Sequence, residues 1–451
     1  MIDYYLISAV FIGIAILLFL ILRLKIQAFV ALLIASIAVG VISGMKPADI
    51  IVTMKDGMGN TLGFVAVVVG LGAMFGAILE HSGGAKALAS YLLKQFGEKN
   101  ASWSMVITGF FIAIPVFFDV AFIILVPLLY SLQRKTKKSL LLYAIPLLAG
   151  LAITHAFIPP TPGPVAVADI LKADLGWVIL FGFLVGLPTA IVCGPLFGKY
   201  IANKIFVEAP KSEIEEDDHS DVIKNYPSVG MILSIIGIPI VLIVSNTVLN
   251  SKLFEPETIP VDVKNWLGMI GHPFTALILA NLVAWYLLGI RRGFTKEKLL
   301  DITTKSMGPA GIIILLTGAG GVFKQVLVNT GTGEMLANYF ADKGVSILLF
   351  SFIAAALVRL LQGSATVAMI TAAGITAPLL AIDISAIDKA LLVISIAAGA
   401  SIASHVNDSG FWLVSKYLGL TEKETFKSWT MMTTLLALTG FTVAAIFSLI
   451  F

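Results

Sequence analysis

Long apolar segments recur along this chain, and they constrain its fold more than any other feature. A helix needs ~20 apolar residues to cross a bilayer. With 58% hydrophobic and 13% charged residues, the chain lies far from an ordinary soluble domain, in which ~25% of residues are charged. We therefore predict an all-α polytopic membrane protein. The expected uninterrupted crossings are residues 4–22, 26–43, 62–79, 177–197, 229–249, 267–288, 309–327 and 429–450.

A proline cluster in THAFIPPTPGPVAVAD (154–169) adds a second constraint. Proline lacks a backbone N–H and clashes with the preceding helical turn, so Pro159, Pro160, Pro162 and Pro164 must interrupt the helix. Apolar sequence continues on both sides of the cluster. Irregular backbone at membrane depth is tolerated only where it is buried in protein or lines a cavity. We therefore predict a broken helix over 140–171, and its break is expected to form part of a binding site.

Three other segments have the same irregular character. Segment 102–132 bends at IPVFFDV, segment 346–380 bends at LLQGSATV, and segment 389–418 breaks at SHVNDSG. We interpret the first two segments as re-entrant hairpins and the third as a second broken helix. Each half of the chain then has one hairpin and one broken helix.

The two halves also resemble one another in sequence. GAMFGAILEHSGGA from Gly72 aligns with GGVFKQVLVNTGTG from Gly320, and AGLAITH, ending at His155, aligns with AGASIASH, ending at His405. Internal repeats are typical of secondary transporters. Because each half has an odd number of crossings, the second must be inverted. We predict a first repeat over 1–198, a cytoplasmic linker over 199–228 that carries EIEEDDHSD, and a second repeat over 229–451.

The distribution of basic residues predicts the orientation. Cytoplasmic loops of membrane proteins carry an excess of Lys and Arg. If both termini lie outside, most of the 30 Lys and Arg residues lie inside. The outside then holds only Lys46, Lys55, Lys172, Lys252, Lys264, Lys343 and Lys389. We therefore predict that both termini are external.

The two hairpin tips and two helix breaks are expected to meet near the bilayer midplane. The N-termini of half-helices offer free N–H groups and a partial positive charge, which suit an anionic substrate. Hydroxyl and amide side chains suit a substrate with several hydroxyl groups. The substrate-binding candidates are Phe118, Thr161, Pro162, Gly163, Arg359, Gln362, Gly363, Ser364, Thr366, Asn407 and Ser409, with Phe117 beside them.

Four ionisable residues are candidates for proton coupling, because a charge inside the membrane is costly and needs a reason. Asp119, at the first hairpin tip, either carries a proton or caps the following half-helix. Asp408 either coordinates a cation or caps its half-helix. His155 and His405 occupy matched places in the repeats, and each is either a site residue or a satisfied hydrogen-bond partner.

Arg359 precedes the second hairpin tip in an otherwise apolar helix. It either pairs with a substrate carboxylate in bidentate geometry or neutralises Asp119 or Asp408, and we slightly favour the structural pairing. Glu80 and Lys324, near helix ends, are expected to reach the membrane interface.

Other chemistries find little support in the sequence. We expect no cofactor and no nucleic-acid partner. No Cys/His/carboxylate cluster has metal-ligand spacing. GAGG at Gly318 lacks the lysine and hydroxyl pair of a P-loop, which makes direct ATP drive improbable. No nucleophile–base pair suggests an enzyme.

At these motifs the sequence resembles the gluconate permease (GntP-type) family, within a superfamily of inverted-repeat ion transporters. The resemblance spans essentially the whole chain. It rests on GAMFGAILEHSGGA, FFDVAFIILVPL, HAFIPPTPGP, GAGGVFKQVLVNTG, RLLQGSATVAMITAAGI and SHVNDSGFW. It implies proton-coupled uptake of gluconate or a related sugar acid across the bacterial inner membrane.

Two site positions depart from the commoner pattern of that family. Asp119 stands where many relatives carry Glu, and Thr161 stands where many carry His. Both positions lie at the predicted site, and relatives of this family are also associated with fructuronate, idonate, glycerate and D-serine.

The leading hypothesis is a secondary active importer of a small hydroxylated monocarboxylate, driven by protons. Its rivals are a sodium-coupled dicarboxylate carrier of the same superfamily and a passive organic-anion channel. Against the first rival, the hairpin tips lack matched Ser-Asn-Thr triplets. By analogy with carriers of this architecture, a homodimer is expected.

Overall fold

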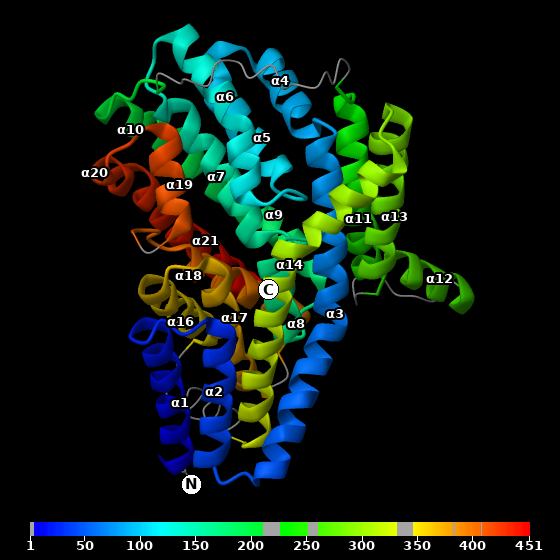
Figure 1. Cartoon of the computed structure of the whole chain (residues 1–451), viewed down its shortest axis with the longest axis vertical. Coiled ribbons are helices and arrows are strands. Elements are labelled where there is room, and N and C mark those ends of the chain that lie inside the picture. The colour runs from blue at the N-terminus through cyan, green and yellow to red at the C-terminus, as the bar shows by residue number, and fades with distance from the viewer. Residues whose placement is uncertain (1–3, 211–225, 251–259, 332–345, 382–383, 407) are drawn as a thin grey trace.

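The computed structural model describes residues 4–210, 226–250, 260–331, 346–381, 384–406 and 408–451. Every regular element within these ranges is a helix, as predicted. The linker motif EIEEDDHSD and Asn407 lie outside the described residues. Figure 1 shows two long helices, α3 and α14, running side by side along the molecule, with the broken elements packed beside them.

From residue 4 onward, the described first half of the chain contains ten α-helices, one short 3-10 turn and one π-helical turn. Figure 1 places α1 and α2 at the end where the chain starts, and α4, α5, α6 and α10 toward the opposite end. The bounds are α1 Tyr4–Leu22, α2 Ala28–Ile42, α3 Pro47–His81, α4 Gly84–Phe96, α5 Ala101–Ile112, α6 Phe118–Thr136, α7 Leu141–Phe157, α8 Pro162–Leu171, α9 Leu175–Ile191, η2 Val192–Leu196 and α10 Phe197–Lys204, with a short turn η1 Glu98–Asn100 before α5.

The described part of the second half is also helical. Its bounds are α11 Val229–Asn250, α12 Val261–Gly271, α13 Pro273–Ala284, η4 Trp285–Gly289, η5 Ile290–Arg292, α14 Lys296–Asn329, α16 Ile347–Gln362, α17 Ala365–Thr376, η6 Ala377–Ala381, α18 Ala386–Ser401, α19 Ser409–Leu418, α20 Glu422–Thr425, η7 Phe426–Thr430 and α21 Met431–Ile450. Helix α10 occupies the start of the predicted linker.

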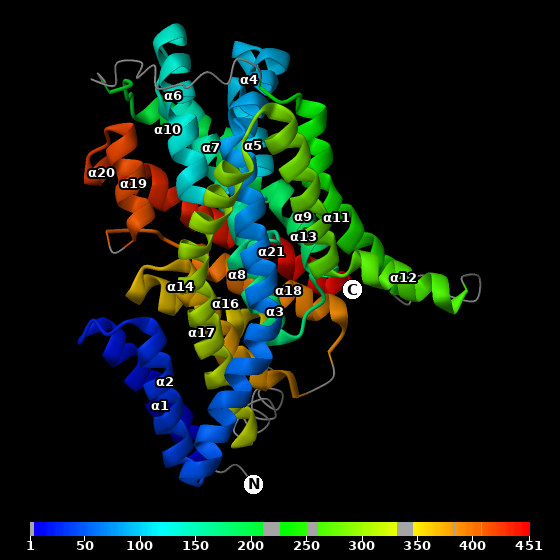
Figure 2. The ribbon, with the colours of Figure 1, turned by 45° about the vertical axis from the view of Figure 1, so that its right-hand side comes forward.

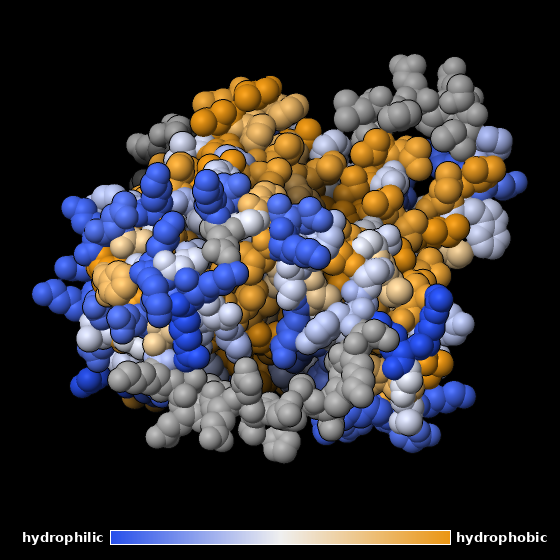
Figure 3. Space-filling model, turned by 90° about the horizontal axis from the view of Figure 1, so that it is seen from above, coloured by the Kyte–Doolittle hydropathy of each residue, from blue (hydrophilic) through white to orange (hydrophobic). Residues whose placement is uncertain are grey.

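Seven of the described helical segments are long and apolar enough to cross a membrane. They run over Pro47–His81, Leu141–Leu171, Leu175–Lys204, Val229–Asn250, Pro273–Arg292, Lys296–Asn329 and Glu422–Ile450. Seen from the end that carries α4 and α6, hydrophilic residues cover much of the face and hydrophobic residues gather toward one side (Figure 3). The protein is a multi-pass membrane protein.

Helices α3 and α14 are much longer than hydropathy alone predicts, with 35 and 34 residues. At 1.5 Å per residue each is ~50 Å long, more than the ~30 Å hydrocarbon core. The turns beyond the apolar segments contain polar residues such as Lys55, and close packing between the two helices keeps these turns helical. A Cβ built on Gly57 of α3 would lie 2.8 Å from the backbone oxygen of Gly321 in α14.

The crossing predicted over 267–288 is interrupted. Helix α12 ends at Gly271, and Figure 2 shows it projecting sideways from the body. Helix α13 starts at Pro273, where proline is tolerated because the first N–H of a helix has no partner within it. The side chain of His272 accepts a hydrogen bond from Phe274 N at 3.3 Å and caps α13. Because the whole segment is apolar, its composition does not indicate that a new helix, α13, starts at Pro273.

The four irregular segments are interrupted where the prolines and polar motifs predict. The chain leaves helical conformation between α5 and α6, α7 and α8, α16 and α17, and α18 and α19. Helix α5 packs on α7, and α16 packs on α18. The segment Leu141–Leu171 is the most deeply buried of the apolar spans. The four interruptions lie at about mid-length along the long axis of the molecule (Figure 1).

The α5–α7 contact depends on two glycines that face one another. A Cβ on Gly150 would overlap the backbone oxygen of Val106, and one on Gly109 would overlap the backbone oxygen of Leu147. Backbone atoms cannot move aside as a side chain can. We expect Gly150→Ala to destabilise the protein by at least ~1–3 kcal/mol through overpacking.

Thermal unfolding of the purified protein in detergent measures this effect. Gly63→Ala in α3 is the matched control, because a Cβ at Gly63 would have no neighbouring atom within 4 Å. Alanine is favoured over glycine inside a helix by ~0.5–1 kcal/mol, so the control should be neutral or stabilising. An unchanged unfolding temperature for Gly150→Ala would contradict the packing described here.

Candidate functional site

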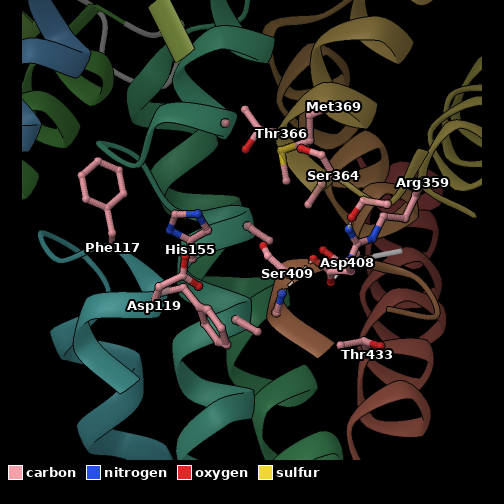
Figure 4. Close-up of a pocket in the computed structure, with 18 of the residues that line it drawn as sticks. Phe117, Asp119, His155, Arg359, Ser364, Thr366, Met369, Asp408, Ser409 and Thr433 are labelled. Carbon is pink, nitrogen blue, oxygen red and sulfur yellow. Dashed lines mark hydrogen bonds and ion pairs between the residues drawn. The ribbon is translucent and has the colours of Figure 1, made fainter. Parts of the chain in front are cut away.

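A cavity of about 650 Å³ lies where the four interruptions meet. The four helices that follow them, α6, α8, α17 and α19, all begin at its wall. Figure 4 shows side chains from these elements around the cavity. The predicted residues that line it are Phe117, Phe118, Asp119, His155, Pro162, Gly163, Arg359, Gln362, Gly363, Ser364, Thr366, Asp408 and Ser409.

Several backbone N–H groups at these helix starts have no protein acceptor. Within the described residues, the N–H groups of Asp119, Gly163 and Thr366 donate no hydrogen bond. No side chain caps α6 or α8. In the other two helices Ser364 accepts from Val367 N at 3.3 Å, and Asp408 accepts from Gly410 N at 3.0 Å. The cavity therefore presents partial positive charge and free donors, which suit an anion.

Arg359 and Asp408 form a buried ion pair at one side of the cavity, as Figure 4 shows. Their side chains are 5% and 13% exposed. Arg359 also donates to the backbone oxygen of Gly363, which closes α16 in the left-handed conformation at φ +88°. Glycine adopts that conformation without the steric cost that other residues incur. Of the alternatives for Arg359, the geometry matches the pairing with Asp408.

A further set of hydrogen-bonded side chains lies behind this ion pair and was not predicted from the sequence. Ser404 donates to Asp408 and accepts from the indole N–H of Trp429 at 2.6 Å. The backbone N–H of Ser404 donates to the hydroxyl of Thr433 at 3.1 Å. Trp429 and Thr433 also line the cavity. The sequence predicts their segment only as the last crossing, because no local signal marks it as part of the site.

Asp119 and His155 lie on the other side of the cavity, with Ser409 between them and the ion pair in the view of Figure 4. The carboxylate of Asp119 has no hydrogen bond or ion pair within the described residues, and it interacts electrostatically with Asp408. Nδ1 of His155 is buried without a partner in the same part of the chain. The ring of Phe117 packs against His155, with centroids 6.4 Å apart.

Two predicted site residues lie outside the cavity wall. Thr161 is 5% exposed, and its hydroxyl donates to the backbone oxygen of Ile158 at 2.6 Å. This hydrogen bond stabilises the irregular backbone between α7 and α8. Nε2 of His405 lies 3.0 Å from the backbone oxygen of Leu360 and connects the second break to α16. For His405 the geometry is that of a satisfied hydrogen-bond partner.

Gly163 has a packing role as well as a place in the cavity wall. A Cβ at this position would lie 2.6 Å from Sδ of Met369 in α17. The close neighbour is therefore the end of a flexible methionine side chain, which can move aside more easily than backbone. Met369 itself lines the cavity and was missed by the sequence analysis.

A smaller hollow of about 280 Å³ adjoins the cavity and shares Phe117, Val120 and Pro309 with it. Glu80 lies in its wall, together with charged residues of α14. Lys324, the other ionisable residue noted in the sequence, lies near the C-terminal end of α14. It interacts electrostatically with Asp169 of α8.

The residues near Gly318 do not form a loop. Gly318, Gly320 and Gly321 lie inside α14, where they allow close contact with α3 and α17. Within the described residues no group of three or more His, Cys, Asp or Glu side chains could hold a metal ion.

The fold and the central cavity define a multi-pass membrane transport protein. The family model of the GntP permeases matches residues 5–450, so the chain belongs to the GntP permease family and is not an enzyme. It is 43% identical to a low-affinity gluconate transporter of Escherichia coli over 96% of each chain. It is 38% identical to the Gnt-II system L-idonate transporter of the same species over 95% of each chain.

A solved structure supports the fold independently. The transporter MtrF of Neisseria gonorrhoeae, described as one of a class of antimetabolite efflux pumps, superposes with a TM-score of 0.63. The superposition covers 97% of this chain and 94% of that one, at 16% sequence identity. At this identity the likeness concerns the fold alone.

Proposed function

We propose that the protein imports gluconate or a closely related sugar acid across the bacterial inner membrane, with protons as the coupling ion. The observation that carries the proposal is the convergence of four helix N-termini on one cavity of about 650 Å³. The free N–H groups at these N-termini would bind the carboxylate. Relatives named for gluconate and L-idonate support a polyhydroxylated monocarboxylate as the substrate.

The polar side chains of the cavity suit the rest of such a substrate. Thr366 and Ser409 make no hydrogen bond through their hydroxyls within the described residues, so both are available to substrate hydroxyls. Ser364 and Gln362 engage the backbone of the α17 start and would hold its geometry. Idonate differs from gluconate only in stereochemistry, so the residues that separate the two are expected among these hydroxyls.

Asp119 is the proposed proton carrier. Its carboxylate faces the cavity without a protein partner among the described residues, whereas Asp408 is already neutralised by Arg359. His155, with Nδ1 unpartnered in the same part of the chain, is the candidate to exchange the proton with Asp119 or with the substrate. A proton on Asp119 would remove a negative charge from the cavity and so favour entry of the substrate anion.

The two halves of the chain are proposed to be inverted repeats, 1–198 and 229–451, with both termini outside and the linker in the cytoplasm. Alternating access would then move the broken elements against the long helices α3 and α14. Cysteine labelling of Lys46→Cys and Lys135→Cys in intact cells tests the orientation: only the first should react with an impermeant reagent. A homodimer is also proposed, and crosslinking in the membrane tests it.

Uptake into proteoliposomes tests the coupling. An inward proton gradient is expected to drive gluconate accumulation, whereas a sodium gradient at constant pH should not. If one proton accompanies each anion, one pH unit is worth ~1.4 kcal/mol, or about tenfold accumulation. Accumulation that follows sodium would overturn proton coupling, and mere equilibration would indicate a channel. Excess succinate should compete far less than idonate, because a second carboxylate would meet Asp408 or Asp119.

A further inference from the structure

A second cavity, of about 600 Å³, lies apart from the central one. It is formed by η1, α5, the connection between α6 and α7, the start of α7, η2 and α10 with the residues that follow it. It shares no lining residue with the central cavity. In Figure 1 these elements lie toward the end of the molecule opposite to the N-terminus. The proposed transport mechanism makes no use of this cavity.

Three lysines from three different elements line it: Lys99, Lys138 and Lys199. Within the described residues none of them forms an ion pair, and no Asp or Glu lines the cavity. All three lysines are exposed, so their mutual repulsion is weak in water, but their combined positive charge would attract an anion. The hydroxyl oxygen of Ser102, in the same wall, is buried and has no hydrogen-bond partner in that part of the chain. Charge and an unsatisfied polar group thus both point to an anionic ligand.

The surroundings of the cavity identify the kind of anion. Trp103 and Phe206 line it and are 39% and 61% exposed, and Tyr200 nearby on α10 is 58% exposed. Lys204 lies over the ring of Tyr200, 5.7 Å from its centroid. Exposed Trp and Tyr next to Lys mark the level of a membrane–water interface. Phospholipid headgroups occupy that level.

The volume of the cavity and its proposed position at the cytoplasmic leaflet both fit a lipid ligand. The volume falls within the ~300–1,000 Å³ of pockets that hold drug-sized molecules, so a bare inorganic phosphate would leave most of it empty. In the proposed topology, in which basic residues concentrate in the cytoplasmic loops, these lysines lie on the cytoplasmic side. Anionic lipids give that leaflet a negative surface potential. Basic pockets between transmembrane helices on that side bind such headgroups.

We propose that this cavity binds the phosphate-bearing headgroup of an anionic phospholipid. Lys99, Lys138 and Lys199 would surround the phosphate, and the buried hydroxyl of Ser102 would rotate into the cavity to donate a hydrogen bond to it. Trp103 and Phe206 would contact the apolar part of the lipid next to its headgroup. The shared chemistry is phosphate, and a free phosphate ion is the other source that the experiment must distinguish.

The test uses the full-length protein purified in a neutral detergent. Thermal unfolding is followed while phosphatidylglycerol, phosphatidylcholine or inorganic phosphate is added at equal phosphate concentrations. Phosphatidylglycerol is expected to stabilise the wild type, and the other two are not. The triple variant Lys99→Gln/Lys138→Gln/Lys199→Gln should need at least tenfold more phosphatidylglycerol for the same stabilisation. Native mass spectrometry should show less co-purified anionic lipid on this variant.

Two further variants keep the result interpretable. Lys416→Gln/Lys423→Gln/Lys427→Gln removes exposed lysines of α19, α20 and η7 that do not line the cavity, and should titrate like the wild type. Ser102→Ala tests the buried hydroxyl alone and should weaken the lipid effect severalfold. Equal lipid titration of the wild type and the first triple variant would overturn the proposal. Lysine-dependent stabilisation by inorganic phosphate at the same concentration would overturn the lipid as the source.

Discussion

Arg359→Gln is expected to abolish uptake and to destabilise the purified protein by about 3–5 kcal/mol. Removing one partner of a buried ion pair leaves the other charge buried and unpaired. Arg359 is 5% exposed and bonds to both Asp408 and the backbone of Gly363. The substitution therefore disturbs the junction between α16 and α17 and the break between α18 and α19 together. Thermal unfolding and gluconate uptake in proteoliposomes measure the two effects.

Companion variants separate stability from transport. In Arg359→Gln/Asp408→Asn both charges are gone, so most of the lost stability should return while uptake stays low. Arg359→Lys keeps the charge but cannot reach both partners in the same fork geometry, and an intermediate loss is expected. Wild-type stability in Arg359→Gln alone would show that the ion pair does not hold these elements together.

Asp119→Asn is expected to abolish proton-driven accumulation of gluconate, with a loss of at least ~100-fold, the size typical of removing a positioned proton-transfer group. Exchange of labelled for unlabelled gluconate should persist, because it needs binding and movement but no net proton transfer. Asp119 makes no hydrogen bond or ion pair within the described residues, so its replacement should leave the unfolding temperature nearly unchanged. Asp119→Glu should keep proton coupling.

Asp388→Asn is the matched control for this prediction. Asp388 also lies in the first turn of a helix, α18, but outside the cavity, where it contacts Ser385. A carboxylate near a helix N-terminus contributes ~0.3–1 kcal/mol through the helix dipole. If Asp119 only capped α6, the two variants would behave alike. Full accumulation by Asp119→Asn would remove it from the proton path.

The sequence predicted the interruptions of the helices because their causes are local. Pro159 and Pro160 cannot continue α7, and Gly363 can adopt the left-handed conformation that ends α16. Apolar composition likewise predicted the helical membrane fold. Since most of the site lies at the interruptions, most of the proposed cavity residues could be selected from the sequence.

The same reasoning failed where the outcome depends on distant contacts. His405 lies in the expected motif, yet Nε2 of its ring lies next to the backbone oxygen of Leu360, and only the packing of α16 against the second break determines that. Trp429 reaches the site from a segment that looks like an ordinary apolar crossing. The separation of α12 from α13 and the full length of α3 could not be predicted from hydropathy, which averages over neighbouring residues.

By itself, then, the sequence determined that this chain spans a membrane in helices and where those helices break, since proline, glycine and apolar content act within a few residues. The tertiary structure alone decided which polar groups share the cavity. Arg359 and Asp408 are far apart in the chain, and only the packing of α16 against the second break brings them together. The rotation of each helix against its neighbours left Asp119 facing the cavity without a protein partner among the described residues.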